Sequence, residues 1–246
     1  SQILADSSSQ IRFLEREKVV RKDSVVVLGP GSIAGVDLAK FRPNTDLRAK
    51  LRNERNLSQG RLVFLFVGRI VYDKGISDLI DAFGFVNRDH PNWELWIVGP
   101  DEADLKSGLQ ARATNTGNCV RWFESTLNPA RFMRSANILV LPSYREGFGS
   151  VIIEAAACGL PSIAYRTEGV IDAVIDDKTG LLVTKGDVKG LSDAMIRLGS
   201  DQALRNNLGQ FAYERATGEF SSSSLVIHWR KFYYEAIKSK NERSWK

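Results

Sequence analysis

Cysteine and histidine are scarce in this sequence, and their scarcity excludes some kinds of chemistry. The 246 residues contain two cysteines, Cys119 and Cys158, and two histidines, His90 and His228. No spacing among them resembles that of a zinc site, so we expect no structural zinc. Each cysteine stands in an apolar context, and we interpret both as buried free thiols, which are typical of a reducing compartment. The two histidines lie far apart in the sequence, and we assign neither of them a catalytic role.

Long apolar runs and an excess of one charge are also missing. No segment approaches the roughly 20 apolar residues that a membrane span needs. The composition is 43% hydrophobic and 26% charged, as in globular proteins. The net charge is +5 with both signs interspersed, so the charge pattern does not by itself indicate nucleic acid. We find no signal peptide, and residues 1–23 begin abruptly, as if cut from a longer protein.

Short apolar segments alternate with amphipathic ones along the chain. This alternation predicts strands connected by helices, and therefore an α/β fold with a doubly wound, Rossmann-like parallel sheet in one domain. The expected strands are Ser24–Gly29, Arg61–Gly68, Trp93–Gly99, Val120–Phe123, Ala136–Pro142, Ser162–Tyr165 and Thr179–Val183. The longer expected helices are Asp46–Asn56, Ser77–Val86, Val151–Cys158, Asp187–Gly199, Asp201–Thr217 and Leu225–Lys240. The acidic residues Asp101, Glu102 and Asp104 fit helix capping better than a metal site.

One stretch, Ala136–Pro161, combines a buried strand, a loop with two glycines and a short helix. Gly147 and Gly149 allow a ligand to approach the backbone closely, because they have no side chains. The first N–H groups of the following helix lack acceptors within the helix and favour an anion. The stretch therefore predicts an anion site, although similar turns occur throughout α/β proteins and a plain structural turn explains it equally well.

Two carboxylates frame this loop, Glu146 before it and Glu154 one turn into the helix. Carboxylates that faced a phosphate would repel it, whereas carboxylates accept hydrogen bonds readily from hydroxyl groups. A phosphate and a polyol together suggest a nucleotide-sugar as the ligand.

Two cations follow the clearest buried strand, Arg61–Gly68. Arg69 and Lys74 stand directly after its carboxyl end, where open α/β sheets bind their ligands. Arginine grips phosphate with two parallel hydrogen bonds, and lysine acts as a point charge. The alternative is a solvated pair of surface charges, and the segment alone does not decide between the two.

Motifs across essentially the whole chain resemble those of the GT-B glycosyltransferases of family 4. Glu146 and Glu154 are separated by seven residues, as in the EX7E motif of that family. Further matches fall in the expected order at Gly35–Asp37, Gly68–Gly75, Gly159–Pro161 and Thr179–Val183. The loop Gly31–Asp37 is most similar to bacterial enzymes that add sugars to undecaprenyl-diphosphate-linked intermediates of surface polysaccharides.

The resemblance implies roles for individual residues. Arg69 and Lys74 would bind the donor diphosphate and stabilise the leaving nucleotide, and with Glu146 they form the implied catalytic set. Glu146 would accept hydrogen bonds from the transferred sugar, and Glu154 from the ribose. The base would lie near Val120–Trp122. The implied donor-binding set is completed by Arg121, Phe148, Gly149, Ser150 and Val151.

The resemblance also implies the architecture. Residues 1–246 would be a single nucleotide-sugar (donor) binding domain, the C-terminal half of a GT-B enzyme. Residues 1–23 would be a lead-in element from the interdomain region. Residues 225–246 would form a helix and tail that cross back to the N-terminal acceptor domain, which we expect to be absent. We therefore expect the fragment alone to bind the donor and to transfer little or no sugar.

The implied activity is transfer of a hexosyl or N-acetylhexosaminyl group with retention of anomeric configuration. The donor would be a nucleotide diphosphate-sugar, with uridine favoured by family frequency. The acceptor would be lipid-linked or a polysaccharide, as in bacterial lipopolysaccharide and surface polysaccharide synthesis. The full enzyme would act at the cytoplasmic face of a membrane, peripherally bound. Neither a metal nor another cofactor is implied, which agrees with the lack of an Asp-x-Asp motif.

Two other functions stay open. A GT-B relative such as a sugar-nucleotide epimerase or a phosphorylase would need a histidine or cofactor-lysine site of its own, which we do not find. A non-catalytic nucleotide-binding or interaction module would bind the donor without turnover, even with an acceptor domain restored.

Overall fold

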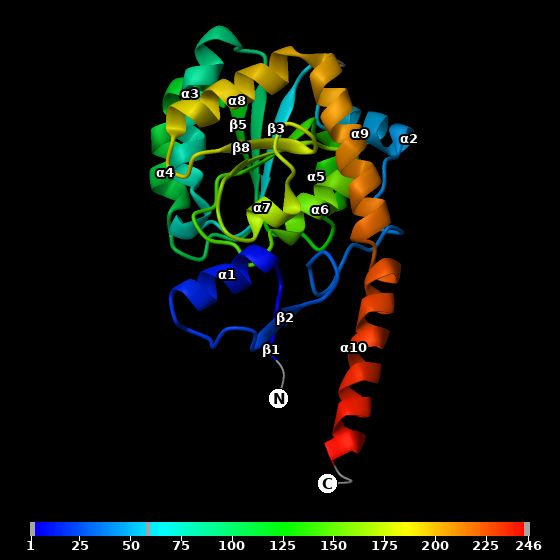
Figure 1. The fold of residues 1–246 in the computed structure, drawn as a ribbon. Coiled ribbons are helices and arrows are strands. Elements are labelled where there is room, and N and C mark those ends of the chain that lie inside the picture. The colour runs from blue at the N-terminus through cyan, green and yellow to red at the C-terminus, as the bar shows by residue number, and fades with distance from the viewer. Residues whose placement is uncertain (1–2, 58–59, 244–246) are drawn as a thin grey trace.

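The computed structural model describes residues 3–57 and 60–243, and its main body is a six-stranded parallel sheet with helices on both faces (Figure 1). The strands lie in the order β5–β4–β3–β6–β7–β8. They are β3 (Val63–Val67), β4 (Glu94–Val98), β5 (Val120–Phe123), β6 (Ile138–Leu141), β7 (Ser162–Tyr165) and β8 (Gly180–Val183). All six lie within segments predicted as strands, and the Rossmann-like α/β class is confirmed.

The central strands are buried on both faces. Phe64 and Leu65 of β3 and Ile138 and Leu139 of β6 are fully buried. A parallel strand that is covered by helices on both sides needs an unbroken apolar run, and this is the pattern that made these strands predictable. The covering helices are α2 (Thr45–Glu54), α3 (Ile76–Asp89), α4 (Lys106–Arg112), α5 (Ala130–Ser135), α6 (Ser150–Ala157), α7 (Val170–Ala173), α8 (Val188–Ser200) and α9 (Gln202–Glu219).

A small second unit at the N-terminus lies beside the main sheet. The strands β1 (Ile3–Ala5) and β2 (Val25–Val27) form a separate two-stranded parallel sheet, joined by α1 (Ser8–Arg16). The strand predicted at Ser24–Gly29 therefore exists, but outside the main sheet. β1 was not predicted, because a strand of three residues carries almost no periodicity.

This N-terminal unit is tied to the loop before α6. Ser7 caps α1 by accepting a hydrogen bond from the Gln10 N–H, and its hydroxyl donates to the carbonyl oxygen of Gly147 at 2.9 Å. The Ser9 N–H donates to the Asp172 carboxylate at 2.8 Å. These contacts hold residues from the start of the chain against the segment that the sequence marked as a ligand site.

The last helix, α10 (Ser222–Arg243), leaves the main body and runs toward the N-terminal unit (Figure 1). Trp229 Nε1 donates to the Ile33 carbonyl oxygen at 3.1 Å, and His228 and Phe232 line a cavity together with β2. Tyr233 is 57% exposed. None of the helices in the described ranges has the length and apolar character to cross a bilayer.

The two cysteines differ in burial. Both are free thiols, as predicted, and Cys158 is buried. Cys119 is partly exposed, contrary to prediction, because it stands at the entry to β5, which is an edge strand of the sheet.

Candidate functional site

The strand order reverses between β3 and β6. From β3 the chain moves outward through β4 and β5, and then returns to place β6 on the other side of β3. The connections after these two strands lead away in opposite directions, which opens a crevice at their carboxyl ends. A cavity of about 390 Å³ lies there. It is lined by seven of the predicted site residues, namely Arg69, Lys74, Glu146, Phe148, Gly149, Ser150 and Val151.

A second cavity, of about 640 Å³, continues from the first toward α1. The two cavities share Arg69, Lys74, Glu146 and Gly147. The space available to a ligand at this edge of the sheet is therefore larger than either cavity alone. We call the two together the switch-point crevice.

Lys74 is placed in the crevice by a tight turn. It is the last residue of a short 3-10 segment, Tyr72–Lys74, which ends at Gly75 in the left-handed conformation with φ 65°. A Cβ at Gly75 would collide with the Pro142 carbonyl oxygen, so only glycine permits this close approach of the two loops. The Tyr144 N–H also donates to the Asp73 carbonyl oxygen at 2.8 Å. The loop after β3 and the loop after β6 are thereby joined.

Lys74 and Glu146 form a partly buried ion pair. Lys74 Nζ lies 2.5 Å from Glu146 Oε1, and the side chains are 17% and 13% exposed. Removing two charges from water costs free energy that their mutual attraction must offset, so breaking such a pair without replacement is unfavourable. A ligand that brings both an anionic group and hydroxyl groups can separate the pair and give each side chain a new partner.

Arg69 points to a partner that the sequence did not reveal. Its Nη1 lies 3.0 Å from Glu102 Oε2, and the two side chains are 59% and 44% exposed. The predicted capping role holds for Asp101, whose carboxylate accepts hydrogen bonds from the N–H groups of Leu105 and Lys106. Glu102 instead forms the ion pair with Arg69. Exposed ion pairs contribute little stability, so Arg69 can exchange Glu102 for a phosphate at low cost.

The N-terminus of α6 opens onto the crevice. Gly149 precedes the helix with φ 79°, and in the described part of the chain no side chain caps the first turn. The N–H groups of Ser150 and Val151 therefore remain for a ligand, and the helix dipole favours an anion there. The Phe148 ring is buried and packs against Phe220, with 5.3 Å between ring centroids. Phe148 thus offers the ligand its backbone and not its side chain.

Glu154 lies further along α6 and lines neither cavity of the crevice. Its side chain is partly buried, and in the described part of the chain its carboxylate has no hydrogen-bond or ion-pair partner. Burial raises the pKa of Glu154, and the nearby charge of Lys40 opposes that shift. A carboxylate held in this way is able to accept hydrogen bonds from hydroxyl groups.

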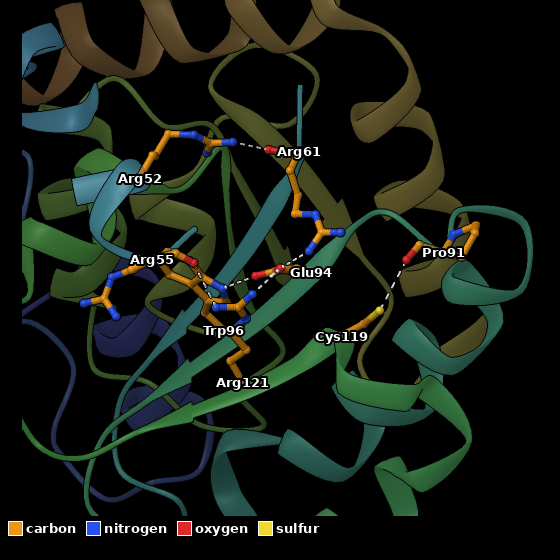
Figure 2. A network of polar contacts seen from close by, with 8 residues as sticks. All are labelled: Arg52, Arg55, Arg61, Pro91, Glu94, Trp96, Cys119 and Arg121. Carbon is orange, nitrogen blue, oxygen red and sulfur yellow. Dashed lines mark hydrogen bonds and ion pairs between the residues drawn. The ribbon is translucent and has the colours of Figure 1, made fainter. Parts of the chain in front are cut away.

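Arg121 is not brought to the crevice. Figure 2 shows it beside Glu94, near the amino end of β4, where Arg121 Nη2 lies 2.8 Å from Glu94 Oε1. Glu94 is 1% exposed, and it also pairs with Arg61 at 2.6 Å and accepts a hydrogen bond from Trp96 Nε1 at 2.8 Å. The position of β5 could be inferred from sequence, but the direction of a single strand side chain could not.

Fold and crevice together define an α/β protein with a crevice lined by Arg69, Lys74 and Glu146 at the switch point of its sheet. The chain matches the family described as "Glycosyl transferases group 1" over residues 48–215. It belongs to that family.

Individual relatives agree with this assignment. The chain is 31% identical to the capsular polysaccharide biosynthesis glycosyltransferase CapM of Staphylococcus aureus, over 96% of this chain and 62% of CapM. It resembles the structure of sucrose-phosphate synthase from Thermosynechococcus elongatus, with 28% identity and a TM-score of 0.82 over 96% of this chain and 58% of that one. Anabaena HepE in complex with UDP and glucose has the same fold, with 22% identity and a TM-score of 0.85 over 97% of this chain and 63% of HepE. The chain thus spans about three fifths of the length of each relative.

Proposed function

We propose that this chain binds the nucleotide-sugar donor of a glycosyltransferase, with a UDP-sugar as the ligand. The observation that carries the proposal is the convergence of Arg69, Lys74, Glu146 and the α6 N-terminus on one crevice. HepE, with the same fold, has been solved with UDP and glucose, which supports uridine as the base.

Each group has one role in the proposed complex. Lys74 and Arg69 bind the diphosphate together with the free N–H groups of α6. When the bond to the sugar breaks, negative charge grows on the diphosphate oxygen, and these fixed positive groups stabilise it. Glu146, released from Lys74, accepts hydrogen bonds from hydroxyls of the transferred sugar. Glu154 accepts those of the ribose, which would extend from the crevice along α6. Arg121 has no role in the proposal, because Glu94 occupies it.

The reaction of the longer enzyme is proposed at a coarser level. The name of CapM supports a role in surface polysaccharide synthesis, and a lipid-linked or polysaccharide acceptor is what the motif resemblance adds to it. Retention of configuration, independence of metal and contact with the inner membrane surface rest on the EX7E resemblance alone. Because the chain spans about three fifths of its relatives, we assign it the donor and assign the acceptor to the remaining length that those relatives have.

Calorimetric titration with UDP, GDP and ADP, in the presence of EDTA, tests the proposal. We expect one nucleotide to bind, and the Arg69→Ala/Lys74→Ala variant to lose about 100-fold or more in affinity, because hydrogen bonds to charged groups contribute about 1.5–3 kcal/mol each. The matched control is Lys189→Ala/Arg197→Ala, which removes one lysine and one arginine, 71% and 54% exposed, from α8. Equal affinities in both double variants would reject the site.

If none of the three nucleotides binds in the titration, the proposal for this chain is rejected. A second result would favour the alternative of a non-catalytic nucleotide-binding module. In that result a nucleotide binds this chain, but a protein that joins the chain to an acceptor domain transfers no sugar.

A further inference from the structure

A further cavity, of about 590 Å³, lies at the opposite edge of the sheet from the switch-point crevice. It is enclosed by the start of α2, one side of α9 and the segments that lead into β6 and β7. Figure 1 shows α2 and α9 side by side at this edge. We call it the arginine cavity, because among the residues that the structure describes its lining includes three arginines, Arg48, Arg134 and Arg205, and no carboxylate.

The three arginines are fixed by backbone carbonyl groups. Arg48 Nη1 donates to the carbonyl oxygens of Arg134 and Ala136, and Arg205 Nη1 donates to those of Leu198 and Gly199 at 2.9 Å each. Arg134 donates through Nε and Nη2 to the carbonyl oxygens of Arg42 and Lys40. Carbonyl groups orient a guanidinium but carry no net charge, so these contacts do not neutralise the arginines.

No acidic side chain completes the set. Within the described ranges, none of the three arginines forms a salt bridge. Burial lowers the pKa of Arg205, and the charge of Asp201 opposes this shift. The Asp201 Oδ1 accepts the Leu204 N–H as the cap of α9. Burial, together with the neighbouring charges of Arg52 and Arg205, lowers the pKa of Arg48 to about 10. Partly desolvated cations that repel one another are stabilised by an added anion.

The other lining groups also suit an anionic ligand. Asn44 and Thr45 bring the positive N-terminal end of α2, a helix of ten residues, to the cavity wall. Asn206, Gln210 and Tyr213 of α9 add neutral hydrogen-bonding groups. The volume exceeds what a single phosphate fills and lies in the range of small-molecule sites, roughly 300–1,000 Å³.

We propose that the arginine cavity binds a small phosphorylated molecule, with its phosphate on the arginines and its hydroxyl groups on the α9 side chains. Guanidinium groups form paired hydrogen bonds with phosphate oxygens, and a phosphate ester brings more negative charge to the three arginines than a single carboxylate does. Helix α6 runs from the crevice, at Ser150, to this cavity, which Cys158 lines just after the helix ends. The two sites are therefore separate and can be filled together, and the proposal does not depend on the proposed function.

The test is calorimetric titration of the chain with inorganic phosphate and with a hexose phosphate, at an ionic strength kept constant with chloride. The informative variant is Asn206→Asp, which places one negative charge on the cavity wall and leaves the arginine hydrogen bonds intact. Its control is Asn207→Asp, the same change on the next residue of α9, which is exposed and does not line the cavity. We expect Asn206→Asp to weaken phosphate binding about tenfold through charge repulsion and Asn207→Asp to change it less than about twofold.

Three results would overturn the proposal: no binding of either probe above the chloride blank, equal effects of the two variants, or displacement of phosphate by saturating UDP. Tighter binding of the hexose phosphate than of inorganic phosphate would identify a phosphate ester as the ligand. Equal affinity would contradict the part of the proposal that places hydroxyl groups on the α9 side chains.

Discussion

Lys74 and Glu146 stand 72 residues apart in the sequence, and their charged atoms lie 2.5 Å from each other. Each side chain is therefore the counter-ion of the other when no ligand is bound. An anion alone can pair with Lys74 but leaves the Glu146 carboxylate partly buried and unpaired. A neutral sugar alone can hydrogen-bond Glu146 but leaves Lys74 without a counter-ion. A nucleotide-sugar supplies an anion and hydroxyl groups in one molecule, so it replaces both partners at once.

Glu146→Gln should separate the two parts of the donor. The glutamine no longer holds Lys74 as an ion pair, so we expect UDP to bind as tightly as before or a few-fold more tightly. UDP-glucose and UDP-N-acetylglucosamine should lose roughly tenfold, because the hydroxyl groups lose a charged acceptor that contributes about 1.5–3 kcal/mol. Calorimetry with the three ligands measures this difference.

The control for this variant is Glu124→Gln, a carboxylate that is 83% exposed and pairs with Lys106 outside the crevice. It should leave all three affinities unchanged. Similar losses of UDP and of UDP-sugars in Glu146→Gln would contradict the assignment of Glu146 to the sugar.

Glu154 predicts a pH dependence of stability. Burial raises its pKa in the folded state above the ordinary value of 4.5. Between the ordinary pKa of the unfolded state and the raised pKa of the folded state, the native state binds more protons than the unfolded state. The free energy of unfolding therefore falls as the pH rises through that window. Glu154→Gln removes this penalty. We expect a higher midpoint of thermal unfolding than in the unchanged chain at pH 7.5, and convergence of the two midpoints as the pH falls below 4.5.

The same variant should bind UDP less tightly, because the ribose hydroxyl groups lose a charged acceptor. Thermal unfolding from pH 4 to 8 and calorimetry at pH 7.5 check the two effects. A Glu154→Gln chain that is less stable at pH 7.5 would show that the carboxylate has a structural partner, and unchanged UDP affinity would remove Glu154 from the ribose site.

The strands of the main sheet could be predicted because burial on both faces demands apolar runs, as in Val63–Val67 and Ile138–Leu141. The switch-point residues Lys74 and Glu146 could be predicted because parallel strands bring their carboxyl ends to one edge. The Arg69–Glu102 pair could not, since it depends on how two exposed loops fold over that edge. β1 escaped prediction because it is short and its partner β2 lies 20 residues further on.

Arg121 shows a different limit. Its segment forms the predicted strand, but the side chain extends to Glu94, so we expect Arg121 to contribute to stability and not to ligand binding. Which carboxylate a long arginine side chain reaches is decided by strand register, here Trp96 opposite Arg121, and register is not visible in an isolated segment.

Glu94→Ala should therefore destabilise the chain strongly. It leaves Arg61, Arg121 and the Trp96 indole N–H without their buried acceptor, and breaking a buried ion pair costs about 3–5 kcal/mol. Urea unfolding should show this loss, whereas Glu54→Ala should cost less than about 1 kcal/mol, since Glu54 pairs with Arg131 at the surface.

UDP affinity of Arg121→Ala should equal that of the unchanged chain. A loss of tenfold or more, with the fold intact, would restore Arg121 to the donor site.

Two glycines, Gly75 just before α3 and Gly84 within it, should respond to alanine in opposite directions. Gly75 precedes the helix with φ 65° and has no room for a Cβ, which would meet the Pro142 carbonyl oxygen. Gly75→Ala should cost roughly 1–3 kcal/mol from backbone strain alone. It should also weaken UDP binding, because the turn that presents Lys74 must shift.

Gly84 lies inside α3, and a Cβ there would meet no atom within 4 Å. Gly84→Ala should therefore stabilise the chain by about 0.5–1 kcal/mol, since alanine loses less conformational entropy than glycine in a helix. Because Gly84 lines neither cavity of the switch-point crevice, the Gly84→Ala variant should bind UDP with unchanged affinity. Urea unfolding and calorimetry on both variants test the pair. If Gly75→Ala kept full stability and full UDP affinity, the close approach of the two loops would not be what positions Lys74.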